Sequence, residues 1–236
     1  MNRNILIFLT ACVNPNGMKY TAVQDQSERL KQYINAIKFY LYETKFRILV
    51  VENTNVDLSK YIDNSKHRLE ILTFNGNNYD KNLGKGYGEA LIMEYATKKS
   101  VFYKEADYVV KITGRNIILN INLLIDEMRN YSYVYANITS RKGRLQCQSR
   151  IVGFPKSYIE DKFLPNINFL DDSKEHFFED LIFETAMGKI KDFYHPILIR
   201  GISGSTGETL SPTILTYIKA PIKYILHKFG LFKIHF

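Results

Sequence analysis

Gly84-Lys-Gly-Tyr-Gly88-Glu-Ala90, the run that follows it to Lys99, and Ala106-Asp-Tyr-Val-Val-Lys-Ile-Thr-Gly114-Arg115 decide the fold of this chain. The first stretch predicts a flexible basic loop that opens a helix, and the last predicts a buried strand that stops at Gly-Arg. In an α/β fold both ends lie near the carboxyl edge of the sheet, where unpaired N–H groups and cations favour anions. The sequence therefore predicts a phosphate-binding edge that includes Lys85 and Arg115.

Apolar segments and amphipathic segments alternate through the first half of the chain. The apolar segments are short and rich in β-branched residues, which predicts buried strands, and the amphipathic ones have the apolar period of a helix. The predicted strands are 5–13, 46–51, 69–74 and 108–113. One predicted helix begins at Ser27, and a second covers 88–100. Strands that alternate with helices form a parallel sheet through right-handed crossovers. The predicted fold class is therefore α/β, a Rossmann-type αβα sandwich.

The second half of the chain is less regular. Its patterns predict helices at 121–130 and within 171–189, beginning near Ser173, and strands at 131–138, 146–154 and 192–199. From Pro212 the pattern is helical again, with a break at Pro221. We therefore expect one domain over residues 1–211 and a basic amphipathic helical tail over 212–236.

Length and composition are those of one large globular domain, because 236 residues with 45% hydrophobic side chains can bury a proper core. Cys12 and Cys147 form no disulfide or metal-binding pattern, which favours free thiols in a reducing compartment. Leu9-Thr-Ala-Cys12 has the form of a lipoprotein cleavage box, but the apolar stretch before it is too short for a signal core. A buried first strand is therefore favoured, and no apolar run has the length of a transmembrane helix.

Half of the formal net charge of +8 lies in the tail, where residues 213–236 contain four lysines and no acid. Apolar residues at helical spacing stand between these lysines, a pattern typical of a helix on an anionic membrane surface. A tail that packs on the core with its lysines in solvent is the alternative. Because no nucleic-acid-binding motif occurs, the charge favours an anionic surface over nucleic acid as a partner.

The first two predicted strands end in short or polar residues: Thr10, Ala11 and Asn14 end the first, and Glu52 and Asn53 end the second. In a parallel sheet these ends share one edge with the basic residues named above. A carboxylate there can accept hydrogen bonds from a ribose or a base, and two cations can bind a diphosphate. The alternative is that Glu52 is a solvated strand end and Asn53 a turn residue.

The glycines Gly84, Gly86 and Gly88 match neither the phosphate-loop pattern nor the dinucleotide-binding fingerprint. A flexible turn that caps a helix is therefore the alternative to a phosphate-binding loop. The sequence also contains no His/Cys cluster and no Asp-X-Asp after a buried strand, and His195 stands alone. These patterns predict no metal ligands.

Two adjacent acids lie among large apolar residues in His176-Phe-Phe-Glu179-Asp180-Leu-Ile-Phe183-Glu184. Acids in such a setting are costly unless they are exposed or functional. A carboxylate held beside a pocket can act as a general base toward an alcohol. The alternative is that Glu179 and Asp180 face water on a helix whose other side belongs to the core.

The stretch Arg200-Gly-Ile-Ser-Gly204-Ser205-Thr-Gly207 has three glycines and several small hydroxyl residues. Glycine-hinged loops commonly close over substrates and exclude water. We therefore expect Gly204 and Ser205 to close over a ligand, with a plain surface connection as the alternative.

The order of these segments resembles the GT-A glycosyltransferases, in particular the bacterial family-2-like enzymes of capsule and lipopolysaccharide assembly. Residues 10–14 resemble their opening segment, Val50-Val-Glu52-Asn53 the strand whose acid binds the nucleoside, and residues 84–90 the glycine-rich helix start. Glu179-Asp180 is similar to the Glu-Asp pair whose Asp is the catalytic base of inverting members. The resemblance covers about residues 4–207 as a pattern of short motifs.

The resemblance implies a catalytic domain that moves a sugar from a nucleotide diphosphate donor, which we interpret as a UDP-sugar, to a hydroxyl of a glycan or lipid-linked glycan. It implies surface polysaccharide assembly, with the protein cytoplasmic or peripheral on the inner face of the bacterial cytoplasmic membrane. Asp180 would remove the proton of the acceptor, with Glu179 beside it, and the reaction would invert the anomeric centre.

One departure from this family is large. Where it usually has Asp-X-Asp, this chain reads Lys111-Ile-Thr-Gly114-Arg115, so cations stand where carboxylates are expected. Charge balance predicts that Arg115, with Lys111 or Lys85, neutralises the donor diphosphate directly. We place Gly86 and Gly114 in the same donor site. A divalent Mg²⁺ or Mn²⁺ ion that acts together with these cations is the alternative.

Two further interpretations fit parts of the sequence. A sugar nucleotidyltransferase shares the αβα layout and a basic glycine-rich loop, although that loop normally follows the first strand, where this chain has only Gly17. A non-catalytic, transferase-like binding module would explain the replaced metal motif. Turnover of a donor separates an enzyme from such a module.

Overall fold

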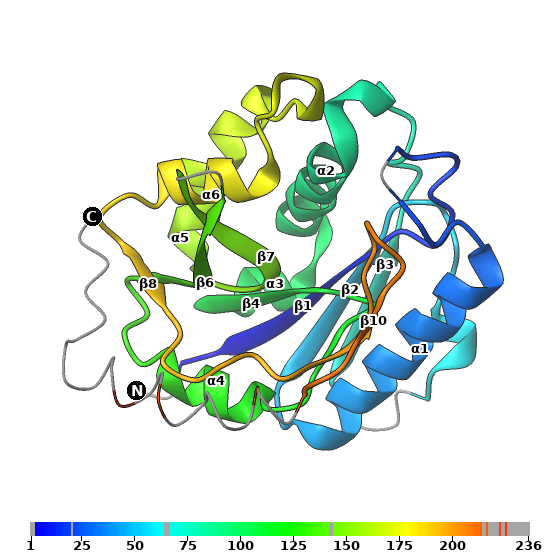
Figure 1. Cartoon of the computed structure of the whole chain (residues 1–236). Helices are drawn as coiled ribbons and strands as arrows, with labels where there is room; N and C mark the ends of the chain where they lie inside the picture. The colour runs from blue at the N-terminus through cyan, green and yellow to red at the C-terminus, as the bar shows by residue number, and fades with distance from the viewer. Residues whose placement is uncertain are drawn as a thin grey trace.

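The computed structural model describes residues 3–19, 21–63, 67–141 and 144–213, with the single positions 216, 222 and 225. Its centre is a seven-stranded sheet in the order β3-β2-β1-β4-β7-β6-β8 (Figure 1). A smaller sheet has the order β10-β9-β5. The strands are β1 (Ile5–Ala11), β2 (Arg47–Glu52), β3 (Leu69–Thr73), β4 (Tyr108–Thr113), β5 (Ile117–Ile118), β6 (Val134–Arg141), β7 (Arg144–Pro155), β8 (Ile190–Asp192), β9 (Ile199–Ile202) and β10 (Thr209–Leu210).

The strands β1 to β4 form the parallel half of the sheet, as the sequence predicts. They are covered on both faces, which explains why they read as nearly continuous apolar runs. The register sets Thr10 opposite Val51 and Thr113, and Ala11 opposite Glu52. The ends of β1, β2 and β4 therefore meet at one edge of the sheet.

Helices lie on both faces of the sheet, and alternate residues of β1 point into the two cores. Ile7 and Leu9 face the core under α1 and α4, and Leu6 and Phe8 face the core under α2 and α6 (Figure 1). This arrangement confirms the α/β sandwich. The α-helices are α1 (Gln26–Glu43), α2 (Gly84–Lys99), α3 (Val101–Glu105), α4 (Ile121–Glu127), α5 (Lys156–Tyr158) and α6 (Phe178–Thr185). Short 3₁₀ or π turns are η1 (Ser59–Tyr61), η2 (Lys81–Leu83), η3 (Ile159–Phe163), η4 (Leu164–Phe169) and η5 (Asp172–Lys174).

The direction of the sheet changes at β7, which runs antiparallel to both β4 and β6. Its register with β6 shifts, because Ala136 pairs with Val152 whereas the next residue, Asn137, pairs with Gln148. Residues 149–151 of β7 therefore have no paired residue on β6. Such irregularities bend a strand and re-aim its side chains, and they occur often beside active sites.

The glycine-rich stretch is the first turn of α2 and not the flexible loop that the sequence predicts. Its glycines allow close packing. A Cβ atom on Gly86 would lie 2.9 Å from Cβ of Phe178, and one on Gly88 would lie 2.2 Å from the hydroxyl oxygen of Tyr79. Gly84 has φ of +84°, a conformation that favours glycine. The glycines thus bring the start of α2 close to α6.

Two predictions for the second half of the chain are wrong. The predicted strand 192–199 is two separate strands, β8 and β9, with an irregular segment between them. The helix expected near Ser173 begins at Phe178, because residues 172–174 form a 3₁₀ turn that ends at Glu175 with φ of +57°. A left-handed residue stops the first turn from continuing into the helix.

The predicted tail helices fall mostly outside the described residues. Of the tail, the structure describes residues 212, 213, 216, 222 and 225, and Ile222 and Ile225 are exposed. No helix within the described part of the chain has both the length and the apolar character needed to cross a membrane.

Candidate functional site

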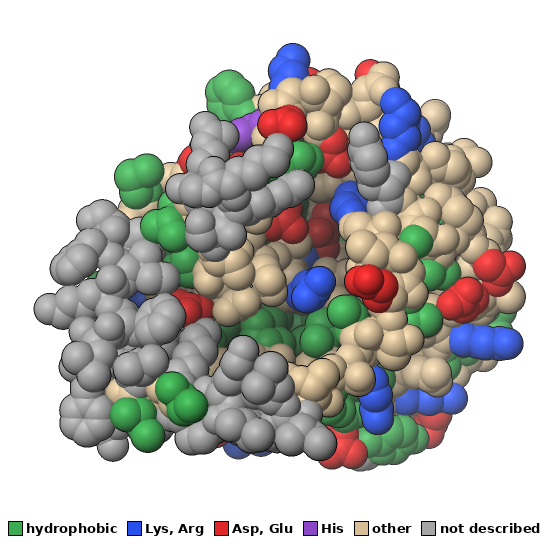
Figure 2. Space-filling view, in the orientation of Figure 1, with side chains coloured by type: hydrophobic (Ala, Val, Ile, Leu, Met, Phe, Trp, Pro, Cys, Tyr) green, Lys and Arg blue, Asp and Glu red, His purple; other side chains and the backbone are tan. Residues whose placement is uncertain are grey.

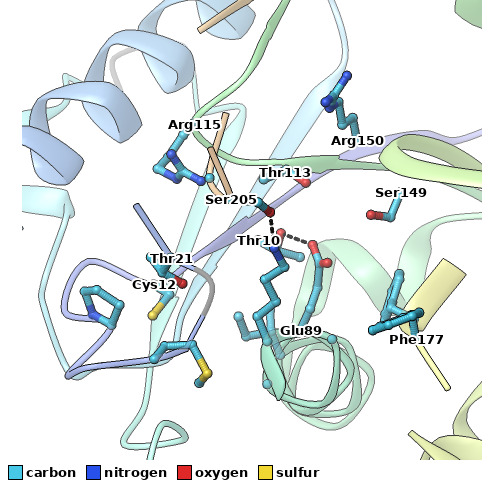
Figure 3. A pocket seen from close by; sticks show the side chains of 18 of the residues that line it. Thr10, Cys12, Thr21, Glu89, Thr113, Arg115, Ser149, Arg150, Phe177 and Ser205 are labelled. Carbon is cyan, nitrogen blue, oxygen red and sulfur yellow. Dashed lines mark hydrogen bonds between the residues drawn. The ribbon is translucent and has the colours of Figure 1, made fainter. Parts of the chain in front are cut away.

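A cavity of about 690 Å³ opens at the carboxyl edge of the parallel strands. Thr10 and Ala11 of β1, Asn53 after β2 and Thr113 of β4 form its floor, which is the edge that the sequence predicts. The first turn of α2, the segment 172–179 and the loop after β9 form its sides. Figure 2 shows the hollow with acidic and basic side chains beside one another, and Figure 3 shows the lining from close by.

Two predicted cations, Lys85 and Arg115, line this cavity, and we call them the cationic wall. Lys85 projects from the first turn of α2, and its ammonium group donates a hydrogen bond to the hydroxyl of Ser205 (Figure 3). Arg115 is 7% exposed and donates to the side-chain oxygen of Gln32 at 3.2 Å. Its guanidinium group lies so close to Gly204 that a Cβ there would be 2.4 Å from Nη2. The predicted loop residues thus contact both cations.

Buried polar atoms without a partner gather in this cavity. Within the described part of the chain there are four buried side-chain nitrogen or oxygen atoms that lack a hydrogen bond. Three of them, Oδ1 of Asn53, Nε of Arg115 and Oδ1 of Asn116, belong to residues that line the cavity. Buried polar groups in native proteins are nearly always paired, so these atoms are the ones that a polar ligand would satisfy.

Lys111 lies below the floor of the cavity and outside its lining. Its side chain is 0% exposed, and its ammonium group lies 2.5 Å from Oε1 of Glu89 and 2.7 Å from the carbonyl oxygen of Ser149. The hydroxyl of Thr10 donates to the same carboxylate oxygen at 2.7 Å. The charge of Lys111 is therefore already balanced by Glu89, and the Lys85 ammonium and the Arg115 guanidinium remain to meet an anion.

Three carboxylates from the segment before and within α6 line the cavity: Asp172, Glu175 and Glu179. We call them the acidic wall. Asp172 is half-buried beside the start of α2, and burial raises the pKa of its carboxyl group to about 6 although Lys85 lowers it. Glu179 accepts a hydrogen bond from the hydroxyl of Ser149. The acidic wall can take up a proton close to the cationic wall.

The two adjacent acids of α6 have different surroundings. Glu179 lines the cavity, whereas Asp180 is absent from its lining. A side-chain oxygen of Asp180 accepts the backbone N–H of Phe177 at 3.0 Å, as in a helix capping box. The geometry thus places Glu179, and not Asp180, beside the space that a ligand can occupy.

Three further predicted donor residues, Asn14, Glu52 and Gly114, do not line the cavity. Glu52 is 0% exposed, and its carboxylate accepts backbone N–H groups of Val13, Thr54 and Val56 at 2.8–3.0 Å. It therefore ties the chain after β1 to the chain after β2. Gly114 lies against β1, because its N–H donates to the carbonyl of Thr10.

Sequence reasoning missed several residues that line the cavity, among them Cys12, Arg29, Tyr33, Glu89 and Arg150. Arg29 and Tyr33 stand one helical turn apart on α1, and both donate to the carbonyl of Cys12. In the sequence, Arg29 lies on the apolar face of the predicted helix, and this position could have indicated a buried cation. Burial raises the pKa of the Cys12 thiol to about 11, so it stays protonated near neutral pH.

The residues present do not fit a divalent ion held by carboxylates after β4. That turn contributes Gly114 and Arg115, neither of which is an anion. Over the described residues, no three His, Cys, Asp or Glu side chains come together in a group that could hold a metal ion.

Comparison with known proteins gives likeness in structure and none in sequence: no family model matches the chain, and no curated protein matches it. The bifunctional glycosyltransferase WbbM is similar over 97% of this chain and 45% of its own, with a TM-score of 0.52 and 12% identity. The inositol-1-phosphate CTP transferase of T. maritima is similar over 95% of this chain and 96% of its own, with a TM-score of 0.51 and 12% identity.

The mannosyltransferase Ktr4p of S. cerevisiae is similar over 90% of this chain and 73% of its own, at a TM-score of 0.49 and 8% identity. The chain spans less than half of the length of WbbM. Likeness at such low identity shows the fold alone. The likeness to WbbM and to the CTP transferase, both with TM-scores above 0.5, agrees with the sheet order and shows that the chain has a GT-A-like α/β fold.

Proposed function

We propose that this protein is a glycosyltransferase that moves a sugar from a nucleotide diphosphate donor to a hydroxyl of a glycan or lipid-linked glycan. One observation carries the proposal: a cavity at the carboxyl edge of a GT-A-like sheet is lined both by cations and by carboxylates. The cations suit a leaving diphosphate, and a carboxylate suits the proton of an acceptor hydroxyl. The donor is a UDP-sugar in this proposal, and surface polysaccharide assembly is its setting.

In the proposed donor site, Lys85 and Arg115 bind the diphosphate. The support is that Arg115 is buried with one N–H unsatisfied and that the ammonium group of Lys85 donates to the neutral hydroxyl of Ser205. Charge-assisted hydrogen bonds to two such cations stabilise the negative charge that develops on the leaving group. The unpaired oxygen of Asn53, at the end of β2, is available to the nucleoside.

The proposed general base is Glu179. It lines the cavity, whereas the side chain of Asp180 caps α6. A base must reach the proton that it removes, and geometry therefore ranks above the family likeness that favours Asp180. With one carboxylate as base and no covalent intermediate, the sugar is transferred with inversion.

The experiment that tests the function starts from binding. Thermal unfolding is measured with uridine, UMP, UDP and a panel of nucleotide sugars, each with EDTA and with Mn²⁺ or Mg²⁺. We expect UDP to stabilise the protein more than uridine does, with EDTA present. A nucleotide sugar that stabilises the protein is then supplied with candidate acceptors, and release of UDP is followed.

Two outcomes would favour the other interpretations. A sugar nucleotidyltransferase would consume a nucleoside triphosphate and a sugar 1-phosphate and release pyrophosphate, and the fold is compatible with both enzymes. Binding of nucleotide sugars without any turnover would favour a binding module. If neither nucleotides nor nucleotide sugars bind, the proposed function is wrong.

The loop 201–207 closes over the bound donor in this proposal. Contacts of Ser205 with Lys85 and of the Gly204 carbonyl with the N–H of Ala22, at 2.9 Å, support a loop that covers the cavity. Slower proteolysis of 201–207 with UDP present would support its closure.

The lysine-rich tail docks on an anionic membrane surface in this proposal. Flotation with acidic vesicles should be lost in a chain that ends near Ser211, and unchanged flotation would exclude docking through the tail.

A further inference from the structure

Arg150 stands on β7 within the stretch that has lost its pairing with β6. The pairs with β4 also end one residue later, at Ile151. Its side chain is half-buried and lines the main cavity. Figure 3 shows it on the other side of Thr113 from Arg115, so the two arginines approach the cavity from different sides.

The guanidinium group of Arg150 forms no hydrogen bond and no ion pair with any residue that the structure describes. Among the other cations in or beneath the cavity, Lys111 pairs with Glu89 and Arg29 donates to backbone carbonyls, whereas Lys85 and Arg115 form the cationic wall. A partly desolvated guanidinium group offers five N–H donors in a planar fork that matches a carboxylate or a phosphate. The position of Arg150 therefore provides an anion site that no residue described by the structure fills.

A second cavity, of about 260 Å³, adjoins the first at this residue. Arg150 and Gln148 line both cavities, which therefore meet at these two residues, and we call the second cavity with these residues the groove. The side chain of Gln148 likewise forms no hydrogen bond with a residue that the structure describes. The remaining lining residues are Asn137, Pro196, Ile197 and Ile199. Apolar surface with a few amides and one cation suits a sugar ring that carries an acidic group.

We infer that Arg150 binds an acidic group of the acceptor, a carboxylate or a phosphate on the glycan that receives the sugar. This inference rests on the proposed function, because it assigns the donor to the cationic wall and the acceptor to the groove along β7. Glu179 bonds to the hydroxyl of Ser149, the residue before Arg150. An acceptor anchored at Arg150 would thus have its hydroxyl groups next to the proposed base.

The test measures binding of small acidic sugars and does not depend on turnover. Methyl β-glucuronide, glucose 6-phosphate and the neutral methyl β-glucoside are titrated by NMR against the wild type, Arg150→Gln and Arg200→Gln. Arg200 is an exposed arginine on β9, so its variant carries the same charge change outside the groove. UDP is titrated in parallel, and thermal unfolding checks that each variant is folded.

We expect the wild type and Arg200→Gln to bind at least one acidic sugar about tenfold more tightly than the neutral one, as a charge-assisted bond implies. Arg150→Gln should lose this preference while it keeps the affinity for UDP. Preference for the glucuronide or for the phosphate tells which acidic group the site takes.

Three results would overturn the inference: no acidic sugar preferred by the wild type, an unchanged preference in Arg150→Gln, or an equal loss of UDP binding in that variant. The last result would assign Arg150 to the donor diphosphate. If UDP fails to bind the wild type but the acidic preference depends on Arg150, the anion site stands and the proposed donor site fails.

Discussion

The cationic wall and the acidic wall of the cavity are built in different ways. Lys85 and Arg115 come from the first turn of α2 and from the turn after β4, two places that the parallel register fixes. Asp172, Glu175 and Glu179 come from a 3₁₀ turn, a left-handed residue and the start of a short helix. The first wall follows from regular structure, and the second from irregular chain packed against it.

This difference teaches which charges are available. Under the floor between the two walls, the ion pair of Lys111 with Glu89 neutralises one cation and one acid. The remaining charges of the two walls keep opposite signs in one cavity. Arg115 is buried, Asp172 and Glu179 are half-buried, and Lys85 and Glu175 are exposed.

Substitution of Glu179, the proposed base, tests the acidic wall most directly. Glu179→Gln should reduce sugar transfer by about 10²–10⁴-fold, because a general base contributes on that order. Initial rates of UDP release at saturating donor measure this. Asp180→Asn is the matched control: it should retain transfer and lower the free energy of unfolding by about 1 kcal/mol through the weakened helix cap. Lost transfer in Asp180→Asn with near-normal transfer in Glu179→Gln would reassign the base to Asp180.

The ion pair under the floor is broken by Glu89→Gln, which leaves the buried ammonium group of Lys111 without a counter-charge. Removal of one partner from a buried pair should lower the free energy of unfolding by about 3–5 kcal/mol. The double variant Glu89→Gln/Lys111→Met removes both charges and should recover most of the loss in chemical denaturation. If the single variant is as stable as the wild type, the pair is not the balance that we describe.

Arg115→Ala removes one of the two cations of the cationic wall. This variant should bind UDP more weakly by about 1.5–3 kcal/mol while uridine binding changes little, because only the diphosphate meets the guanidinium group. Isothermal titration with both ligands measures the difference. Arg47→Ala, at an exposed arginine paired with Glu105, is the control and should bind both as the wild type does. An equal loss for uridine and UDP in Arg115→Ala would indicate general damage.

The smallest expected effect concerns Asp172, whose pKa is raised from 3.8 to about 6 by burial. Between these values the folded state binds more protons than the unfolded state, so the free energy of unfolding falls as pH rises through this window. Asp172→Asn should lack this contribution and be more stable than the wild type above pH 6. The free energy of unfolding of both proteins is measured by chemical denaturation from pH 4 to pH 7. A constant difference between the wild type and Asp172→Asn over this range would contradict the raised pKa of Asp172.

Much of the parallel half follows from the sequence. Its strands are apolar along their whole length because both faces are covered, and this pattern is visible without a structure. The strand Tyr108–Thr113 has the predicted bounds, and the turn after it brings Arg115 into the cavity as expected. The prediction of a single strand over 192–199 is wrong, because isolated apolar residues in an irregular connection resemble a short strand.

The alternation of strands and helices is visible in the sequence, and so are the edge at which β1, β2 and β4 end and the presence there of Lys85 and Arg115. Which charges pair with one another depends on how the elements pack. Lys111 and Glu89 are far apart in the chain, and their contact depends on how α2 packs over β4. Glu179 and Asp180 are neighbours, but successive residues of a helix point about 100° apart. Which of the two faces the cavity therefore depends on the orientation of α6 against the sheet, and a local pattern of residue types does not contain that orientation.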